Sequence, residues 1–138
     1  MPAMSFFRHA ACLAVPVALS TVACSGSASS SSSSAPVIDD LQVPSPFTGS
    51  GTQYSVQGTI TFHDDSAAIT TLHEKIPAYS LDSTVAITGA TEQGTAQIIL
   101  GFVATSAVAS GTQVEIDVSL IDANGKESNV EVETIGVP

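Results

Sequence analysis

The chain has 138 residues, and its 13 acidic side chains outnumber the three lysines and arginines, which gives a formal net charge of −10. Nucleic-acid binding needs cationic side chains to neutralise phosphates, and an anionic lipid surface repels an acidic chain. Composition therefore excludes both kinds of partner. The two cysteines are too few for a disulfide framework.

The first 23 residues have the features of a targeting segment. Arg8 supplies a positive charge, and the apolar run Ala10–Ala23 that follows it is closed by small residues. This run is too short for a helix that spans about 30 Å of hydrocarbon, but it suits the apolar core of a signal peptide. We therefore expect residues 1–23 to be a signal peptide.

Cys24 follows Thr21, Val22 and Ala23. This stretch resembles the lipobox of bacterial lipoproteins, although the family has an aliphatic residue where this chain has Thr21. The resemblance implies that Cys24 is lipidated, and that the protein is held in the cell envelope through a lipid anchor. Ser25 is not the aspartate that retains lipoproteins at the inner membrane, so the implied destination is the outer membrane. Simple secretion and a cytoplasmic location are the alternatives.

Residues 24–36 are expected to form a linker. An unbroken serine run extends from Ser29 to Ser34, and such a composition buries no apolar surface and stays flexible. The remaining residues, 37–138, suit a single domain with one core.

The domain shows the alternation of apolar and polar residues that is typical of β-strands. It is clearest in Tyr54–Phe62, Val114–Asp122 and Val130–Ile135, whereas Thr95–Ala104 is apolar on both faces. Weaker strands are expected at Val37–Val43, Ile69–Ile76 and Thr84–Thr88. Asn124–Gly125 is a hairpin-turn signal, because both residues tolerate positive φ. The pattern predicts an all-β fold, an antiparallel sandwich of about seven strands.

Two stretches carry a further resemblance. "VEIDVSLIDANGKESNVEVETI" resembles the closing hairpin of immunoglobulin-like and fibronectin type III-like domains in bacterial surface lipoproteins, and "GTITFHDD" resembles their second strand and the loop after it. The likeness covers about half of the domain. It implies an immunoglobulin-like β-sandwich.

Alternate loops of such a sandwich meet at one end, and here they are acidic. Oxygen-rich loops can bind Ca²⁺, which takes six to eight oxygen ligands. A solvated acidic end is the simpler interpretation, because no EF-hand spacing is present. The candidate Ca²⁺ ligands are Asp64, Asp65, Glu92, Asp122, Asn124 and Glu127.

A second acidic feature is expected on a sheet face. A last hairpin centred on Gly125 pairs Val118 with Val132 and Leu120 with Val130 in the core, and sets Asp117 opposite Glu133. Like charges in such positions are destabilising. The face is then either fully solvated or covered by a basic partner, such as an envelope protein with a basic surface. Its residues are Glu115, Asp117, Glu131 and Glu133.

Catalytic motifs are weak. His63 and His73 could share a zinc site, but "HEKIP" lacks the second histidine of an HExxH helix. No GxSxG elbow or phosphate-binding loop is present. We therefore expect a non-enzymatic, tethered binding or structural module without an obligate cofactor. A calcium-dependent adhesion or stabilising module is the first alternative, and a small envelope hydrolase or metalloenzyme is the second.

Overall fold

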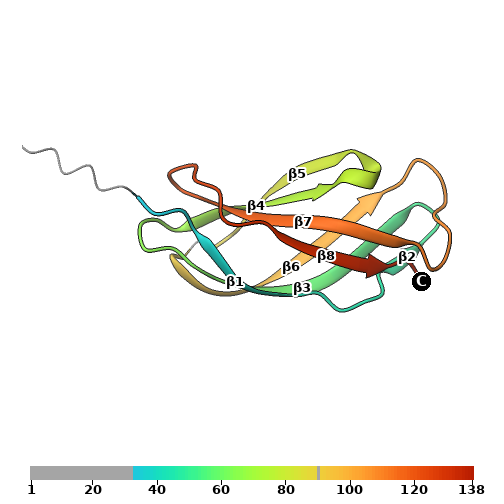
Figure 1. Cartoon of the computed structure of the whole chain (residues 1–138), viewed down its shortest axis with the longest axis horizontal. Helices are drawn as coiled ribbons and strands as arrows, with labels where there is room; N and C mark the ends of the chain where they lie inside the picture. The colour runs from blue at the N-terminus through green and yellow to red at the C-terminus, as the bar shows by residue number, and fades with distance from the viewer. Residues whose placement is uncertain (1–32, 90) are drawn as a thin grey trace, which may run out of the picture. The chain divides into compact units, whose positions relative to one another are not determined.

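A computed structural model describes residues 33–89 and 91–138 of the chain. The expected signal peptide, Cys24 and residues 24–32 of the expected linker lie outside the described residues. Within them the structure is an all-β sandwich of two antiparallel sheets (Figure 1). The predicted fold class is confirmed.

Eight strands and one short 3-10 turn make up this sandwich, which is one strand more than predicted. They are β1 (Val37–Gln42), β2 (Thr48–Ser50), β3 (Gln53–His63), β4 (Ile69–Ile76), η1 (Pro77–Tyr79), β5 (Leu81–Ala86), β6 (Gln93–Val103), β7 (Gln113–Asp122) and β8 (Glu131–Gly136). Among the described residues, no helix is long and apolar enough to cross a membrane.

The first sheet is built around β3, whose alternating pattern buries one face. Along one edge β3 pairs first with β2 and then with β1, and along its other edge it pairs with β6 over its full length. Sequence analysis missed β2, which forms a tight hairpin with β3 through Gly51, where φ is +71°.

The second sheet has the order β5-β4-β7-β8. β4 matches the predicted range, whereas β5 begins earlier than the predicted Thr84. The reason is local: the left-handed Ser80 closes the 3-10 turn, so that Leu81 already pairs with Ile76.

The core of the described residues lies between the sheets and extends from Ile38 to Val137. Phe102 is the centre of an aromatic cluster, with ring centroids 4.4 Å from Tyr79, 5.3 Å from Tyr54 and 5.4 Å from Phe47. Tyr79 is half-buried and its ring stacks on Phe102.

The predicted register of the last hairpin is wrong. Glu127 bridges to Ile121, so the turn is centred on Asn124 rather than Gly125. Further along, Val118 pairs with Glu131 and Asp117 with Val132. The segment from Glu127 to Glu131 therefore contains one residue more than the strand that it faces. Opposite this segment, the main-chain amide of Leu120 on β7 donates to the Ser128 hydroxyl rather than to a main-chain carbonyl.

This shift reverses the faces of β8, because a one-residue slip moves every side chain across the sheet. Val130 and Val132, expected in the core, are 53% and 55% exposed. The strand contributes to the core only at its end, through Ile135 and the following Val137.

Hydrogen bonds connect the two sheets along the side where β1 and β8 lie. The amide of Ile38 donates to Asn129 Oδ1 at 2.8 Å, and Asn129 Nδ2 donates to the carbonyl of Ile38 at 3.2 Å. At the other end, the amide of Phe47 donates to the Gly136 carbonyl at 2.9 Å. This side of the sandwich is therefore closed at both ends.

Candidate acidic site and ionisable clusters

The loops after β3, β5 and β7 meet at one end of the sandwich, as the sequence predicted. The amide of Asp64 donates to the Glu92 carbonyl at 2.6 Å, and the amide of Ala123 donates to the Ala68 carbonyl at 2.9 Å. The segment before β1 reaches the same end, because the Ser34 carbonyl oxygen lies 3.0 Å from the Ser66 hydroxyl oxygen and Lys126 Nζ donates to the Ser33 carbonyl.

Asp64 is buried at this end, with 4% of its surface exposed. Its Oδ1 atom accepts hydrogen bonds from the amide of Ser66 at 2.8 Å and from the hydroxyl of the same residue at 2.9 Å. Burial alone raises the pKa of this carboxyl, but the hydrogen bonds from Ser66 and Ala67 outweigh burial and hold the pKa below its ordinary value.

Asp122 is also buried, with 2% of its surface exposed, and it organises the β7–β8 turn. Its Oδ1 atom accepts from the amides of Asn124 at 2.8 Å and Lys126 at 2.7 Å. This Asx-turn geometry explains why an aspartate starts the turn.

The second oxygens of these two carboxyl groups have no hydrogen-bond partner among the described residues. Both Oδ2 atoms are buried, and the side chain of Asp122 adjoins that of Asp64. Two ionised carboxylates repel each other, whereas a cation between them would make the contact favourable. Asp64 and Asp122, termed here the buried carboxyl pair, are the strongest candidate site at this end.

The other residues predicted as Ca²⁺ ligands do not join the pair. Asp65, Glu92 and Asn124 are exposed, and Glu127 is directed to His73 on the second sheet. Within residues 33–89 and 91–138, no group of three or more histidine, cysteine, aspartate or glutamate side chains has the arrangement of a metal site.

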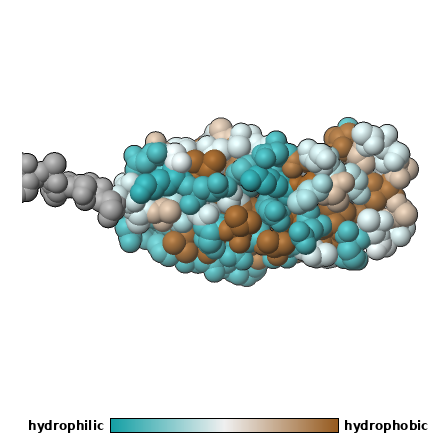
Figure 2. All heavy atoms as spheres, turned by 45° about the horizontal axis from the view of Figure 1, so that its top comes forward, coloured by the Kyte–Doolittle hydropathy of each residue, from teal (hydrophilic) through white to brown (hydrophobic). Residues whose placement is uncertain are grey.

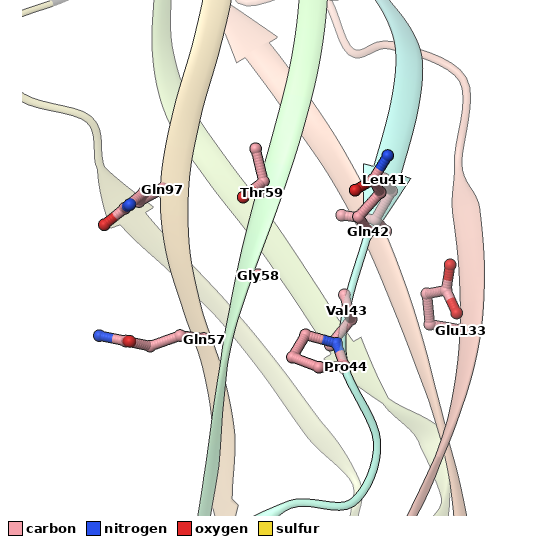
Figure 3. A pocket seen from close by; sticks show the side chains of 9 residues that line it. All are labelled: Leu41, Gln42, Val43, Pro44, Gln57, Gly58, Thr59, Gln97 and Glu133. Carbon is pink, nitrogen blue, oxygen red and sulfur yellow. The ribbon is translucent and has the colours of Figure 1, made fainter.

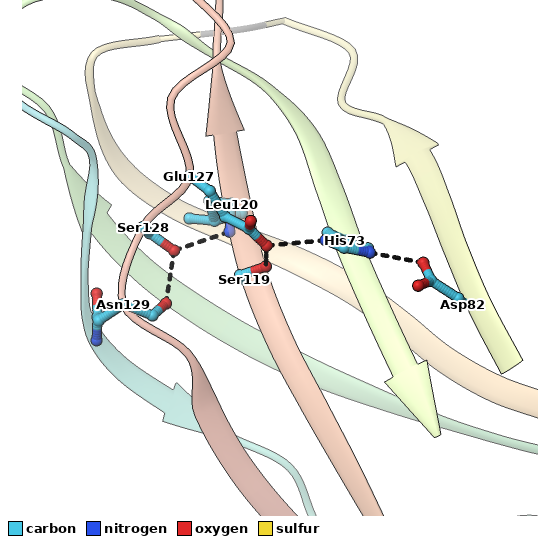
Figure 4. A network of polar contacts seen from close by, with 7 residues as sticks. All are labelled: His73, Asp82, Ser119, Leu120, Glu127, Ser128 and Asn129. Atoms are coloured by element: carbon cyan, nitrogen blue, oxygen red, sulfur yellow. Dashed lines mark hydrogen bonds and ion pairs between the residues drawn. The ribbon is translucent and has the colours of Figure 1, made fainter. Parts of the chain in front are cut away.

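His73 connects three segments of the second sheet (Figure 4). Its Nδ1 atom lies 2.8 Å from Glu127 Oε1, and its Nε2 atom lies 2.7 Å from Asp82 Oδ1. The Ser119 hydroxyl donates to Glu127 Oε1 at 2.5 Å. β4, β5 and the segment after β7 are thus joined through one imidazole, an arrangement termed here the His73 bridge.

An imidazole with a carboxylate on each nitrogen is best satisfied as the imidazolium, because both nitrogens then donate. The hydrogen bond with Asp82, then that with Glu127, raises the pKa of His73 against the opposing effect of burial. The same contacts lower the pKa of Asp82, and the Ser119 hydroxyl followed by His73 lowers that of Glu127. Ser119 is the cross-strand partner of His73, but its hydroxyl donates to Glu127 rather than to the imidazole, unlike the hydroxyl of a nucleophile paired with its base.

His63, the other histidine considered for zinc, lies apart from His73. Its Nδ1 atom is 2.8 Å from Asp39 Oδ2, in a pair of which each side chain is about two-fifths exposed (43% and 42%). This hydrogen bond with Asp39 is the main reason that the pKa of His63 is raised. The structure gives the two histidines separate carboxylate partners and does not bring them together.

The predicted acidic sheet face is divided by the register of β8. Glu115 and Asp117 pair with Thr134 and Val132, on the outer face. Glu133 and Glu131 pair with the buried residues Ile116 and Val118, so they lie on the inner face at the edge of the sheet. The four carboxylates therefore do not form one surface.

Sequence analysis missed Glu74, a carboxyl group within the sandwich. Glu74 is 5% exposed, and its Oε1 atom accepts a hydrogen bond from the amide of Gly101 on β6 at 2.9 Å. Burial raises its pKa, and the bond from Gly101 partly offsets this effect. Alternation placed Glu74 between Leu72 and Ile76 on the inner face, so the signal was present in the sequence.

The hollow beside β3 is lined by a single ionisable side chain, Glu133, among the described residues. This hollow of about 640 Å³ is bounded by β3, the end of β1 and β8. The side chains of Gln57 and Gln97 extend to one side of β3, away from Glu133, which lies on the opposite side of that strand (Figure 3). Figure 2 shows separate hydrophobic clusters set among hydrophilic atoms on the face that it presents.

Comparison with known proteins identifies the fold and no family. No family model matches the chain, and no curated protein matches its sequence. Among solved structures, the chain is similar to the PKD domain of an M14-like peptidase from Thermoplasmatales archaeon SCGC AB-540-F20, at 15% identity and a TM-score of 0.50. The match covers 77% of this chain and 98% of that domain, which places the described residues in an immunoglobulin-like, PKD-like sandwich fold.

Proposed function

We propose that this chain is a non-catalytic binding or structural module, tethered to the bacterial cell envelope through lipidated Cys24. The His73 bridge is the observation that carries the non-catalytic part. Both ring nitrogens of His73 face carboxylates, and Ser119 donates to Glu127. The serine, histidine and acidic groups of this bridge thus hold strands together.

The order of segments along the chain supports the proposed tether. The lipobox-like Thr21–Cys24 precedes the serine run, and β1 begins at Val37, after Ala35 and Pro36. A flexible segment of this composition lets a folded domain sample the space near a membrane. An outer-membrane location follows from Ser25 after the cysteine.

Fractionation of cells that express the full chain tests the anchor. Wild type is expected in the membrane fraction, and Cys24→Ser in the soluble extracytoplasmic fraction. Cys12→Ser, which alters the other cysteine, is the matched control and is expected to stay with the membrane. Membrane retention of the Cys24→Ser protein would disprove lipid anchoring.

The partner is proposed to be an envelope protein with a basic surface. The domain retains Lys75 and Lys126 against 13 acidic residues, so a cationic surface would be attracted to it over several ångströms. Cross-linking in intact cells, compared at low and high salt, would identify such a partner. A partner whose capture is unaffected by salt would contradict the electrostatic basis.

A calcium-dependent stabilising module is a second candidate, favoured by the buried carboxyl pair. Asp64 Oδ2 and Asp122 Oδ2 would provide two ligands, with main-chain carbonyls or water as the remaining ligands of a Ca²⁺ ion. Thermal melting in EDTA, Ca²⁺ and Mg²⁺ tests this proposal. A Ca²⁺-specific rise in Tm supports the site, while equal, small shifts with both ions indicate general screening of the acidic surface.

A further inference from the structure

Among the residues that the structure describes, no strand pairs with the second edge of β6, so the side of the sandwich between β5 and β6 is open, in contrast to the side closed by Asn129 and Phe47. β6 pairs with β3 along one edge, and β5 pairs with β4. A groove of about 410 Å³ lies between them, lined by Val85–Thr88 and Ala96–Ile99 together with Leu72. Ile99 is 64% exposed beside this groove.

The free edge of β6 has a defined extent. The amide of Gly101 donates to Glu74 rather than to β3, so it points to the open side. Strand geometry alternates every two residues, and the β3–β6 register is continuous. The main-chain groups of Thr95, Gln97 and Ile99 therefore also point to the open side, and Glu74 occupies the edge beyond them.

This edge lacks the usual protection against pairing with another strand. Edge strands are commonly protected by charged residues, prolines or bulges. β1, β5 and β8 each contain acidic residues, whereas the eleven residues of β6 include no charged residue and no proline. In a chain with a net charge of −10, β6 is a neutral strip.

We propose that β6 pairs antiparallel with β6 of a second copy of this chain, forming a two-fold symmetric dimer with a continuous sheet. The strip is neutral, so two acidic molecules can meet there without opposing their carboxylates. Symmetry places Gln97 opposite its own counterpart, and Ile99 opposite Thr95 of the second copy. The exchanged main-chain groups of these residues form about six hydrogen bonds.

The two-fold centre at Gln97 provides a sharp test. Gln97→Glu sets two carboxylates opposite each other in the dimer and leaves the β3 pairing intact. Gln57→Glu is the matched control, because Gln57 is an exposed glutamine on the neighbouring strand β3, away from the free edge. Both variants change the net charge equally.

Sedimentation equilibrium of residues 33–138, which contain the core between the two sheets, measures the association over a concentration series that reaches millimolar protein. Wild type and Gln57→Glu are expected to dimerise equally, and more strongly as salt is added. Gln97→Glu is expected to raise the dissociation constant roughly fivefold or more. A wild-type monomer throughout the series, or equal effects of the two variants, would overturn the proposal.

Hydrogen exchange gives an independent measurement that does not depend on the variants. The amides of Gln97 and Ile99 are expected to gain protection as protein concentration rises, while the Gly101 amide, already bonded to Glu74, changes little. Dimerisation without protection at Gln97 and Ile99 would place the interface elsewhere and overturn the assignment. A domain that stays monomeric but protects these amides when an extended peptide is added would identify a different occupant of the edge.

Discussion

The side chain of Asn129 bonds both main-chain polar groups of Ile38, although 91 positions separate the two residues. The amide group of Asn129 presents an acceptor and a donor to β1, as a neighbouring strand would. It joins the loop after β7 to the first strand and so connects the two sheets where the chain enters the domain. A single polar side chain thus closes this end of the sandwich.

Asn129→Ala is expected to lower the free energy of unfolding by about 1–2 kcal/mol, because two partly buried main-chain groups of Ile38 lose their partner. Denaturant unfolding of the domain measures the change. Asn124→Ala is the control on the same loop, since Asn124 is exposed and only its main-chain amide takes part in the turn. An equal loss in both variants would show that the Ile38 contact carries no particular stability.

The His73 bridge predicts that stability depends on pH near neutrality. The pKa of His73 in the folded protein is raised above 6.5 by Asp82 and Glu127. The protonated bridge therefore contributes its full stability below pH 6.5, and this contribution is lost as pH rises through the folded-state pKa. Unfolding measured across this range should show a steady decline in free energy with increasing pH.

His73→Gln should flatten that decline and cost about 1.5 kcal/mol at pH 6, because two charge-assisted hydrogen bonds are weakened. His63→Gln is the matched control. The pKa of His63 is also raised, by its bond with Asp39, but the pair is exposed and contributes little. If the decline persists in His73→Gln and vanishes in His63→Gln, the assignment to His73 is wrong.

Glu74 predicts a substitution that stabilises the domain. Burial raises its pKa, because the ionised form of Glu74 is unfavourable in the fold. The amide oxygen of Gln can still accept the hydrogen bond from Gly101. Glu74→Gln is expected to raise the free energy of unfolding at pH 7 by about 1 kcal/mol.

The pH dependence distinguishes this cause from a packing effect. The gain should disappear below pH 4.5, the ordinary pKa of the group, because Glu74 is then protonated in both the folded and unfolded states. Glu115→Gln, on the exposed outer face of β7, should change stability little at either pH. A gain for Glu74→Gln that is the same at low and neutral pH would rule out the charge as its cause.

Alternation along the sequence predicted the strands whose one face is buried over their whole length, such as β3 and β7. It failed for β8, because the register of that strand depends on the turn centre at Asn124 and on one extra residue before Glu131. The contact between Asn129 and Ile38 is non-local, and no local pattern encodes it. Local pattern was also insufficient at the acidic end. The sequence predicted that the loops meet there, but it did not predict that the Glu127 side chain points to His73 and away from the buried carboxyl pair.

The buried carboxyl pair makes a prediction in which stability and cation binding change in opposite directions. In Asp122→Asn the remaining oxygen can still accept from the amides of Asn124 and Lys126, and the new amide nitrogen can donate to Asp64 Oδ2, which has no partner among the described residues. Without Ca²⁺ the variant is therefore expected to be more stable than wild type by about 1 kcal/mol.

If a cation binds between the two carboxylates, the same change removes a charged ligand, so any Ca²⁺-dependent rise in Tm should shrink or vanish. Asp65→Asn, an exposed neighbour, is the control and should alter neither quantity. Thermal melting of the three proteins in EDTA and in Ca²⁺ separates the cases. A stabilised variant with no Ca²⁺ effect in wild type indicates that no cation binds between the two carboxylates, whereas a variant that is less stable than wild type in EDTA contradicts the unpaired Oδ2 atoms themselves.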